Sequence, residues 1–259
     1  MITAKSILDF SRLLETGYLQ NISIDCVVFG YHEKQIKVLC IRMKGMKGWR
    51  LPGGFIKKRE NLDDAAYRAL EERTGVKELF LKQFQTFGHK DRNLKNIESI
   101  PQLQNVPVSE LKKIKWMTER FVSIGYYALT EFSKVTPRQG LLDNECSWFD
   151  IHSLPPLLLD HKQIFNEALK TLQRQLHHEP VGLNLLPAKF TLPEMQALYE
   201  TILYKKLDQR NFTKKLVSLN LIRKLNEKKH IGGHRSPSLY KFNKKAYTSA
   251  LKEGVVLAF

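Results

Sequence analysis

Two apolar runs separated by a short polar stretch dominate the first part of this chain. Residues 22–43 read ISIDCVVFGYHEKQIKVLCIRM, in which the polar letters YHEKQ interrupt segments rich in Val and Ile. Runs of this kind, broken by one polar segment, are typical of a β-hairpin. Further strand-like runs follow at 78–88, 120–132 and 146–151. The pattern therefore predicts a sheet of several strands in the first two thirds of the chain.

Residues 61–75, NLDDAAYRALEERTG, show the period of a helix instead of a strand-like run. The apolar positions at i, i+3, i+4, i+7 and i+8 predict one buried face, and they are Leu62, Ala65, Ala66, Ala69 and Leu70. Asn61 suits the N-cap and Gly75 suits the C′ position. The preceding residues 48–56, GWRLPGGFI, have the composition of a turn, and a second helix is predicted over 161–179.

The last quarter of the chain shows a different order of elements. After PVGLNLLPAKF at 180–190, the pattern predicts two helices, a strand, a glycine turn and a second strand, at 192–205, 209–220, 221–227, 230–235 and 238–243. Two helices followed by a hairpin is the order expected of a winged helix-turn-helix. We therefore predict two domains, 1–179 and 180–259. The first has an extension over about 1–20 and a polar insertion over about 93–117, which is either a lid or disordered.

Charge strengthens the division into two domains. The chain has a net charge of +16, and residues 188–259 hold 15 Lys and Arg against 5 Asp and Glu. Such a basic segment is typical of a module that binds a polyanion, although a merely soluble basic surface has the same composition. No apolar run approaches the roughly 20 residues needed to span a bilayer, so we expect a cytoplasmic protein without a membrane partner. The three cysteines lack disulfide or zinc spacing and are expected to be core thiols.

A set of spaced residues over 54–76, GFIKKRENLDDAAYRALEERTGV, changes the picture. The set is Gly54, Glu60, Arg68, Leu70, Glu72, Gly75 and Val76. This spacing resembles the Nudix box, Gly-x5-Glu-x7-Arg-Glu-U-x-Glu-Glu-x-Gly-U, where U is a bulky aliphatic residue. The resemblance implies an α+β fold: a Nudix-like α/β/α sandwich with a mixed sheet, here followed by the small winged helix-turn-helix. Nudix enzymes cleave nucleoside diphosphate derivatives with Mg²⁺ held by glutamates of the box helix.

Two acidic positions of that pattern hold other residues in this chain, namely Ala69 and Arg73. Carboxylates four residues apart share one helix face and can hold a divalent cation together, whereas a methyl group and a guanidinium cannot. The nearby pair Glu60 and Asp64 is better explained by capping and the helix dipole. We therefore expect no catalytic residues, no metal and no cofactor. The alternative is an active Nudix hydrolase whose basic appendage docks RNA or another partner.

The whole chain over about residues 20–247 resembles the Nudix-related transcriptional regulators of the NrtR family, and within it the sugar-responsive, arabinose regulator-like branch. The features that carry this likeness are the altered box, PVGLNLLPAKFTLPEMQALYETI at 180–202, DQRNFTKKL at 208–216 and LYKFN at 239–243. The resemblance implies a homodimer that binds double-stranded operator DNA and responds to a small molecule in the Nudix domain. It favours a pentose sugar as effector, with ADP-ribose or another nucleotide as the other possibility.

The second helix of the tail supplies the candidate DNA-binding residues. Phe212, Leu216 and Leu219 are spaced to pack inward, which leaves a polar side consisting of Gln209, Arg210, Asn211, Thr213, Lys214 and Lys215. Arg210 and Asn211 suit base edges, and the lysines suit phosphates. A solvated basic face is the alternative. In the glycine turn the candidates are His234, Arg235 and Ser236, where a plain hairpin turn is the alternative.

Candidate effector-binding residues gather where the strand-like segment 78–88 ends. They are His89, Lys90, Asp91 and Arg92, which offer donors and acceptors for hydroxyl groups or phosphates. Asp91 with Arg92 is equally explained as a surface ion pair. Further candidates depend on the side of the strand or helix they face, and they are Glu72, Arg50, Arg120 and Tyr127.

Overall fold

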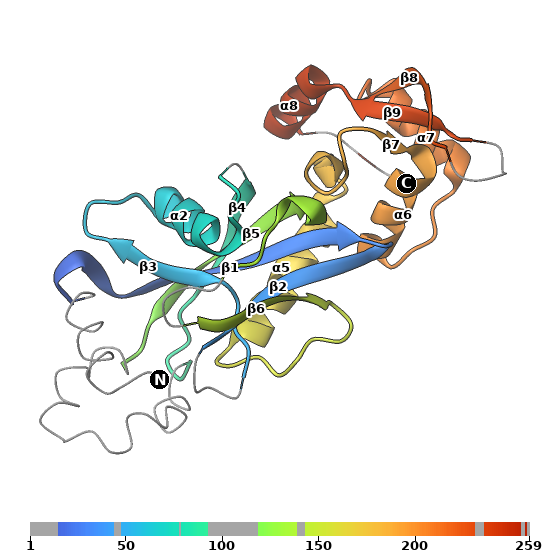
Figure 1. Ribbon diagram of the computed structural model, residues 1–259. Helices are drawn as coiled ribbons and strands as arrows, with labels where there is room; N and C mark the ends of the chain where they lie inside the picture. The colour runs from blue at the N-terminus through green and yellow to red at the C-terminus, as the bar shows by residue number, and fades with distance from the viewer. Residues whose placement is uncertain are drawn as a thin grey trace, which may run out of the picture. The chain divides into compact units, whose positions relative to one another are not determined.

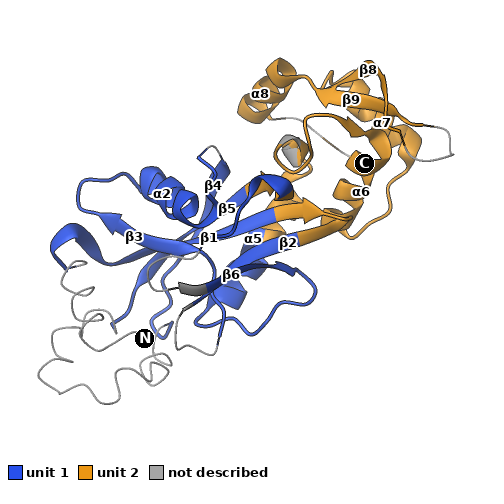
Figure 2. Ribbon diagram, viewed as in Figure 1, with its two compact units in different colours: residues 1–29, 37–128, 133–168 blue, residues 30–36, 129–132, 169–259 orange. Residues whose placement is uncertain are grey.

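The chain forms two compact units in the computed structural model, which describes residues 15–43, 48–77, 79–92, 119–138, 143–230, 236–254 and 257. Unit 1 consists of residues 1–29, 37–128 and 133–168, and unit 2 of residues 30–36, 129–132 and 169–259 (Figure 2). The tip of the first hairpin and the second part of the helix after residue 161 thus group with the C-terminal residues. The insertion over 93–117 lies outside the described residues.

The described part of the first 175 residues has six strands and two helices as its main elements. Figure 1 labels them. They are β1 (Tyr18–His32), β2 (Gln35–Met43), β3 (Gly53–Lys57), α2 (Leu62–Thr74), β4 (Phe80–Phe87), β5 (Val122–Glu131), β6 (Asp143–Asp150) and α5 (His161–Gln175). A single turn of 3₁₀ helix follows β5 at Phe132–Lys134. The strands form one sheet in the order β4-β5-β1-β2-β6, and β3 pairs antiparallel with β1.

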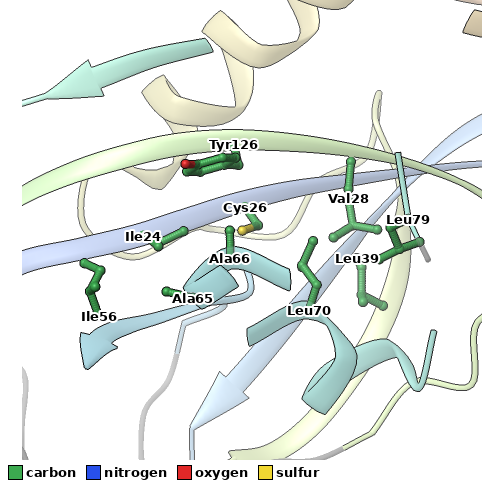
Figure 3. Packing of buried hydrophobic residues seen from close by; sticks show 11 residues of the cluster. Ile24, Cys26, Val28, Leu39, Ile56, Ala65, Ala66, Leu70, Leu79 and Tyr126 are labelled. Carbon is green, nitrogen blue, oxygen red and sulfur yellow. The ribbon is translucent and has the colours of Figure 1, made fainter. Parts of the chain in front are cut away.

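The two faces of β1 pack against different helices. Ile24, Cys26 and Val28 alternate along the strand and lie in one buried cluster with apolar residues of α2 (Figure 3). Phe29 points to the other face, where its ring lies 6.2 Å from that of Phe165 in α5. Side chains of a strand alternate between faces, so a continuous apolar run becomes the middle layer of a helix–sheet–helix sandwich. The predicted fold class, α+β with a C-terminal winged helix, is confirmed.

The predicted hairpin is present, and its turn explains how two long strands reverse in two residues. Glu33 and Lys34 have φ of 49° and 62°. Positive φ at both central positions is the geometry of the turn that matches the twist of the flanking strands.

Helix α2 begins and ends close to where the sequence predicted. Asn61 holds the N-cap position, but its side chain donates to Asp64 Oδ2 at 2.8 Å instead of capping a backbone N–H. Gly75 is the C-cap residue with φ 72°, a left-handed conformation that glycine adopts without steric cost.

Besides the 3₁₀ turns, one helix and two strands of the described residues were not predicted: α8 (Lys244–Glu253), β3 and the two-residue strand β7 (Phe190–Thr191). The prediction of a turn over 48–56 was wrong from Gly53 onward, because that residue begins β3 and pairs with Asp25 of β1. A Cβ at position 53 would lie 2.2 Å from the carbonyl oxygen of Ile24. The glycine therefore permits a close strand approach in addition to a turn.

The C-terminal residues form a small three-stranded sheet with three helices. Besides β7 and α8, its elements are a 3₁₀ turn at Val181–Asn184, α6 (Leu192–Leu203), α7 (Gln209–Ser218), β8 (Ile222–Lys228) and β9 (Ser238–Phe242). The strand order is β7-β9-β8. Tyr199 of α6 contacts Phe212 of α7 with ring centroids 5.3 Å apart, so the two helices share a core. Among the described residues, no helix combines the length and apolarity needed to cross a membrane.

Candidate functional site

Helix α7 presents a polar face because its start and its buried side are both defined by local sequence. Asp208 caps the helix by accepting a hydrogen bond from the backbone N–H of Asn211 at 2.8 Å. Phe212 and Leu216 are buried four residues apart, which determines the inward side. The exposed members of the predicted set are Gln209, Arg210, Asn211 and Lys214, whereas Thr213 and Lys215 are half-buried.

The cations on this face differ from other basic residues of unit 2. Lys206 pairs with Glu200 at 3.1 Å, Lys189 pairs with Glu227 at 2.5 Å, and Lys229 pairs with Glu194. Arg210 and Lys214 form no ion pair within the part of the chain that the structure describes. Their charge is therefore directed to solvent or to an external partner.

The hairpin β8–β9 adds a pair of cations that sequence reasoning missed. Arg223 lies directly opposite Lys241 in the antiparallel register, and both residues are exposed. The neighbouring pair, Ile222 and Phe242, is buried on the other face. Like charges directly opposite in a sheet repel each other, so this arrangement favours an anion above it. His234 and Arg235 lie outside the described residues, and Ser236 is half-buried.

Three of the candidate effector-binding residues in unit 1 are exposed just after β4. They are His89, Lys90 and Asp91. The Nδ1 atom of His89 accepts a hydrogen bond from the backbone N–H of Asp91 at 3.3 Å and lies 3.8 Å from Asp91 Oδ2. The loop therefore holds an imidazole and a carboxylate together at the surface.

Arg92 is neither an exposed effector ligand nor the partner of Asp91 in a surface ion pair, the two interpretations that the sequence offered. Its guanidinium is 3% exposed and forms two hydrogen bonds of 2.8 Å with the carboxylate of Asp160, instead of pairing with Asp91. A further nitrogen donates to the carbonyl oxygens of Phe87 and Phe121. With its donors occupied inside the unit, Arg92 holds the loop after β4 in place and is not an open ligand for an effector.

A buried polar network continues from Arg92 to His161 at the start of α5. Asp25 lies 3.5 Å from the Arg92 guanidinium and accepts a hydrogen bond from the hydroxyl of Ser123. His161 Nδ1 accepts from the backbone N–H of Leu51 at 2.8 Å, and its Nε2 lies 3.5 Å from Asp25. Burial lowers the pKa of His161, with the carboxylate of Asp25 opposing that shift. The neutral imidazole thus joins β1, the loop before β3 and α5.

Two residues that match the spacing of the Nudix box, Glu60 and Arg68, neutralise each other. The guanidinium of Arg68 donates to both oxygens of Glu60 at 2.7 and 2.8 Å, and also to the carbonyl of Phe55. The hydrogen bond from Arg68 lowers the pKa of Glu60 to about 2. Lys57 contributes a backbone N–H to the same carboxylate at 3.0 Å. This pair ties the strand β3 to the helix α2.

The two altered box positions are built into the fold. Ala69 is 2% exposed, and its Cβ lies 3.4 Å from where a Cβ on Gly54 would be. Arg73 has a side chain that is 14% exposed, with Nη1 3.9 Å from the half-exposed carboxylate of Glu72. Across the described ranges, no group of three or more His, Cys, Asp or Glu side chains is placed to hold a metal ion.

The remaining candidates are distributed over three environments. Arg50 is half-buried and bonds through its backbone to Ile41 at 2.8 Å in both directions. Arg120 is exposed and donates to the carbonyl of Gly88. Tyr127 is fully buried, with its ring 5.9 Å from that of Phe80, so its hydroxyphenyl group is part of the core and not of an open surface.

A model of the NUDIX domain matches residues 19–172, which is more than half of this chain. The chain belongs to the Nudix family. A model of the NrtR DNA-binding winged helix domain matches residues 182–242, so this Nudix protein has the architecture of the NrtR-type DNA-binding regulators.

Two relatives and one solved structure are similar to this chain. The ADPR responsive transcriptional repressor NtrR of Acinetobacter baylyi is 25% identical over 228 residues, covering 85% of this chain and 81% of that protein. The ADP-ribose pyrophosphatase of Methanocaldococcus jannaschii is 26% identical over 147 residues, covering 55% and 72%. The crystal structure of Shewanella oneidensis NrtR complexed with a 27mer DNA has a TM-score of 0.70 at 24% identity, covering 88% of this chain and 96% of that one. This last likeness shows a shared fold.

Proposed function

We propose that this Nudix protein is a transcriptional regulator in which the Nudix unit senses a small molecule and thereby changes the binding of the winged helix to operator DNA. The observation that carries the proposal is the exposed face of α7, where Arg210, Asn211 and Lys214 lie together and none of their side chains pairs with a carboxylate in the described structure. In a helix-turn-helix, the N-terminal part of the second helix enters the major groove.

The residue types on that face suit distinct parts of a duplex. Arg210 can form two hydrogen bonds with guanine and Asn211 two with adenine, whereas Lys214 suits a phosphate. The opposed cations Arg223 and Lys241 suit a second phosphate on the hairpin β8–β9. His234, Arg235 and Ser236 stay predicted contacts of the turn between these strands.

ADP-ribose is the effector that we propose, in place of the pentose that the sequence resemblance favoured. The two relatives are an ADPR responsive repressor and an ADP-ribose pyrophosphatase, and neither name refers to a sugar effector. In this chain, Arg73 stands where the box of the hydrolases has an acidic residue. A guanidinium binds phosphate oxygens directly, so a pyrophosphate can be held without a metal ion and without cleavage. The exposed loop residues His89, Lys90 and Asp91 are the further contacts we propose.

A homodimer completes the proposal. One winged helix contacts only a short half-site, and useful genomic specificity requires two half-sites related by a two-fold axis. Sedimentation of the full chain at micromolar concentration is expected to show a dimer, with or without DNA. A monomer in both conditions would contradict this assembly.

The decisive experiment selects duplexes from a random-sequence library with the full-length protein, then measures their affinity with and without ADP-ribose in EDTA. We expect sequence-selective binding whose dissociation constant changes about 5- to 150-fold with ADP-ribose, while arabinose and ribose leave it unchanged. An unchanged constant with ADP-ribose would exclude it as the effector. Release of AMP from ADP-ribose in Mg²⁺, at about 1 per second or faster, would support the hydrolase instead.

A further inference from the structure

Val217 is an apolar residue on a helix face that otherwise carries polar side chains. It is 55% exposed, the highest exposure among the large apolar side chains of the described residues. The inward side of α7 is already filled by Phe212 and Leu216. A β-branched residue has only moderate helix propensity, so neither packing nor helix formation calls for valine at this exposed position.

The helical period places Val217 among the cations described above. It lies seven residues after Arg210 and three after Lys214, and both intervals bring side chains to the same side of a helix. At 3.6 residues per turn the three positions fall within an arc of about 60°. Their common direction is away from Phe212 and Leu216. Val217 therefore lies about one turn beyond Lys214 and about two turns beyond Arg210 on the same side, so a helix that turns Arg210 toward base edges turns Val217 toward them too.

This combination fits the major groove of DNA better than it fits a protein. The two cations attract the phosphates of a duplex, which favours docking of this helix face into a groove. Between the backbones, the edge of each base pair is polar except for the 5-methyl group of thymine, which is the apolar feature that side-chain methyl groups contact. A protein partner would need a larger apolar area, whereas the nearest residues of α7 to Val217 on this face are Thr213 and Lys214, at i−4 and i−3.

We infer that Val217 contacts the 5-methyl group of a thymine in the major groove of the operator and sets the preference for thymine at that base pair. The inference rests on the proposed DNA-binding function and adds a specificity-determining residue to it. Because the contact involves one methyl group, its contribution is separable from the hydrogen bonds of Arg210 and Asn211.

The test replaces thymines one at a time by deoxyuridine, which removes only the methyl group, in the best duplex selected from the random library. For the unmodified protein, we expect about a four-fold loss of affinity at one position in each half-site, as for the loss of one buried methyl group. Val217→Ala is expected to bind the thymine duplex more weakly and to be indifferent to deoxyuridine at that position. Ser218→Ala, an exposed neighbour, is the matched control and should keep the deoxyuridine effect.

Each outcome decides the inference. A selective protein that is indifferent to every deoxyuridine substitution overturns it while leaving the proposed function intact, and this scan needs no variant that must fold. Unchanged deoxyuridine sensitivity in Val217→Ala overturns it too. A change in sedimentation of Val217→Ala without DNA assigns the methyl groups to a second copy of the chain and overturns it. If no duplex is selected, the proposed function fails and the inference fails with it.

Discussion

Helices α2 and α7 carry similar charged residues in opposite circumstances. In α2, Arg68 donates to both oxygens of Glu60 and to a backbone carbonyl, so its charge is neutralised inside the unit. In α7, Arg210 and Lys214 have no acidic partner among the described residues. A cation whose donors are occupied serves the fold, whereas a cation facing solvent is available to an anionic ligand. In α2 the charge of Arg68 thus serves the fold, whereas α7 presents its cations at the surface.

The largest effect on stability is expected at the buried ion pair of Arg92 with Asp160. Asp160→Ala removes the carboxylate that accepts two hydrogen bonds from the buried guanidinium of Arg92 and leaves only Asp25, at 3.5 Å. This change should lower the free energy of unfolding by about 3–5 kcal/mol. All three tryptophans lie within the first 168 residues, so tryptophan fluorescence during denaturation reports on this unit.

Asp91→Ala is the matched control for that experiment, because Asp91 is exposed and adjacent to Arg92 in sequence. Its effect should stay within about 0.5 kcal/mol. Equal denaturation midpoints for the two variants would show that the Asp160 contact does not stabilise the unit.

A smaller effect is expected on DNA binding from the unpaired cations of α7. Arg210→Ala should weaken binding to the selected duplex by about 1–3 kcal/mol and relax the preference at one base pair. Lys214→Ala should instead weaken all sequences alike and reduce the slope of log affinity against log salt by about one. Fluorescence anisotropy over a range of salt concentrations distinguishes them. If both variants keep the affinity, selectivity and salt slope of the unmodified protein while folded, α7 does not bind DNA.

The pH dependence of stability is the next test of the buried network. Burial lowers the pKa of His161 below its ordinary value of 6.5. Below that pH, His161 is protonated in the unfolded chain but stays neutral in the folded chain until the pH falls to its lowered pKa. The contribution of His161 to the free energy of unfolding is therefore fully present above about pH 6.5. It falls as the pH decreases, by at most about 1.4 kcal/mol per pH unit for one proton.

Thermal unfolding between pH 5 and 8, followed by tryptophan fluorescence, measures this slope. His161→Gln should flatten it, whereas His89→Gln, which alters an exposed imidazole, should leave it unchanged. A slope that survives in His161→Gln would assign the dependence to another group.

The smallest effect concerns the two helix ends with left-handed caps. Gly75 ends α2 with φ 72°, whereas Tyr204 ends α6 with φ 52° and is half-exposed. Tyr204→Gly should remove the steric cost of a left-handed tyrosine but increase the conformational entropy of the unfolded chain. Because the first effect is slightly larger, the free energy of unfolding should rise by less than about 1 kcal/mol. Gly75→Ala should act in the opposite direction. Calorimetry of the full chain measures both, and a loss of stability in Tyr204→Gly would show that the tyrosine side chain contributes more than its backbone costs.

Sequence alone determined the features that depend on near neighbours. The period of residues 61–75 and the glycine at its end located α2, because helix faces and caps involve residues within a few positions of one another. The same reasoning located Asp208 as the residue before α7 and identified its inward side. The spacing of the Nudix box and the order of elements after residue 190 identified both domains before any contact was known.

Tertiary structure alone decided which distant groups meet. Arg92 pairs with Asp160, 68 residues away, although Asp91 is its neighbour in sequence. Tyr126 reaches Asp63 of α2 with its hydroxyl at 2.6 Å, whereas Tyr127 is buried on the opposite face of β5. The period of a strand shows that successive side chains point to opposite faces of the sheet. It does not show which of the two faces packs against a given helix. Strand register likewise placed Arg223 opposite Lys241, because pairing across a sheet depends on the packing of the whole unit and not on the spacing within either strand.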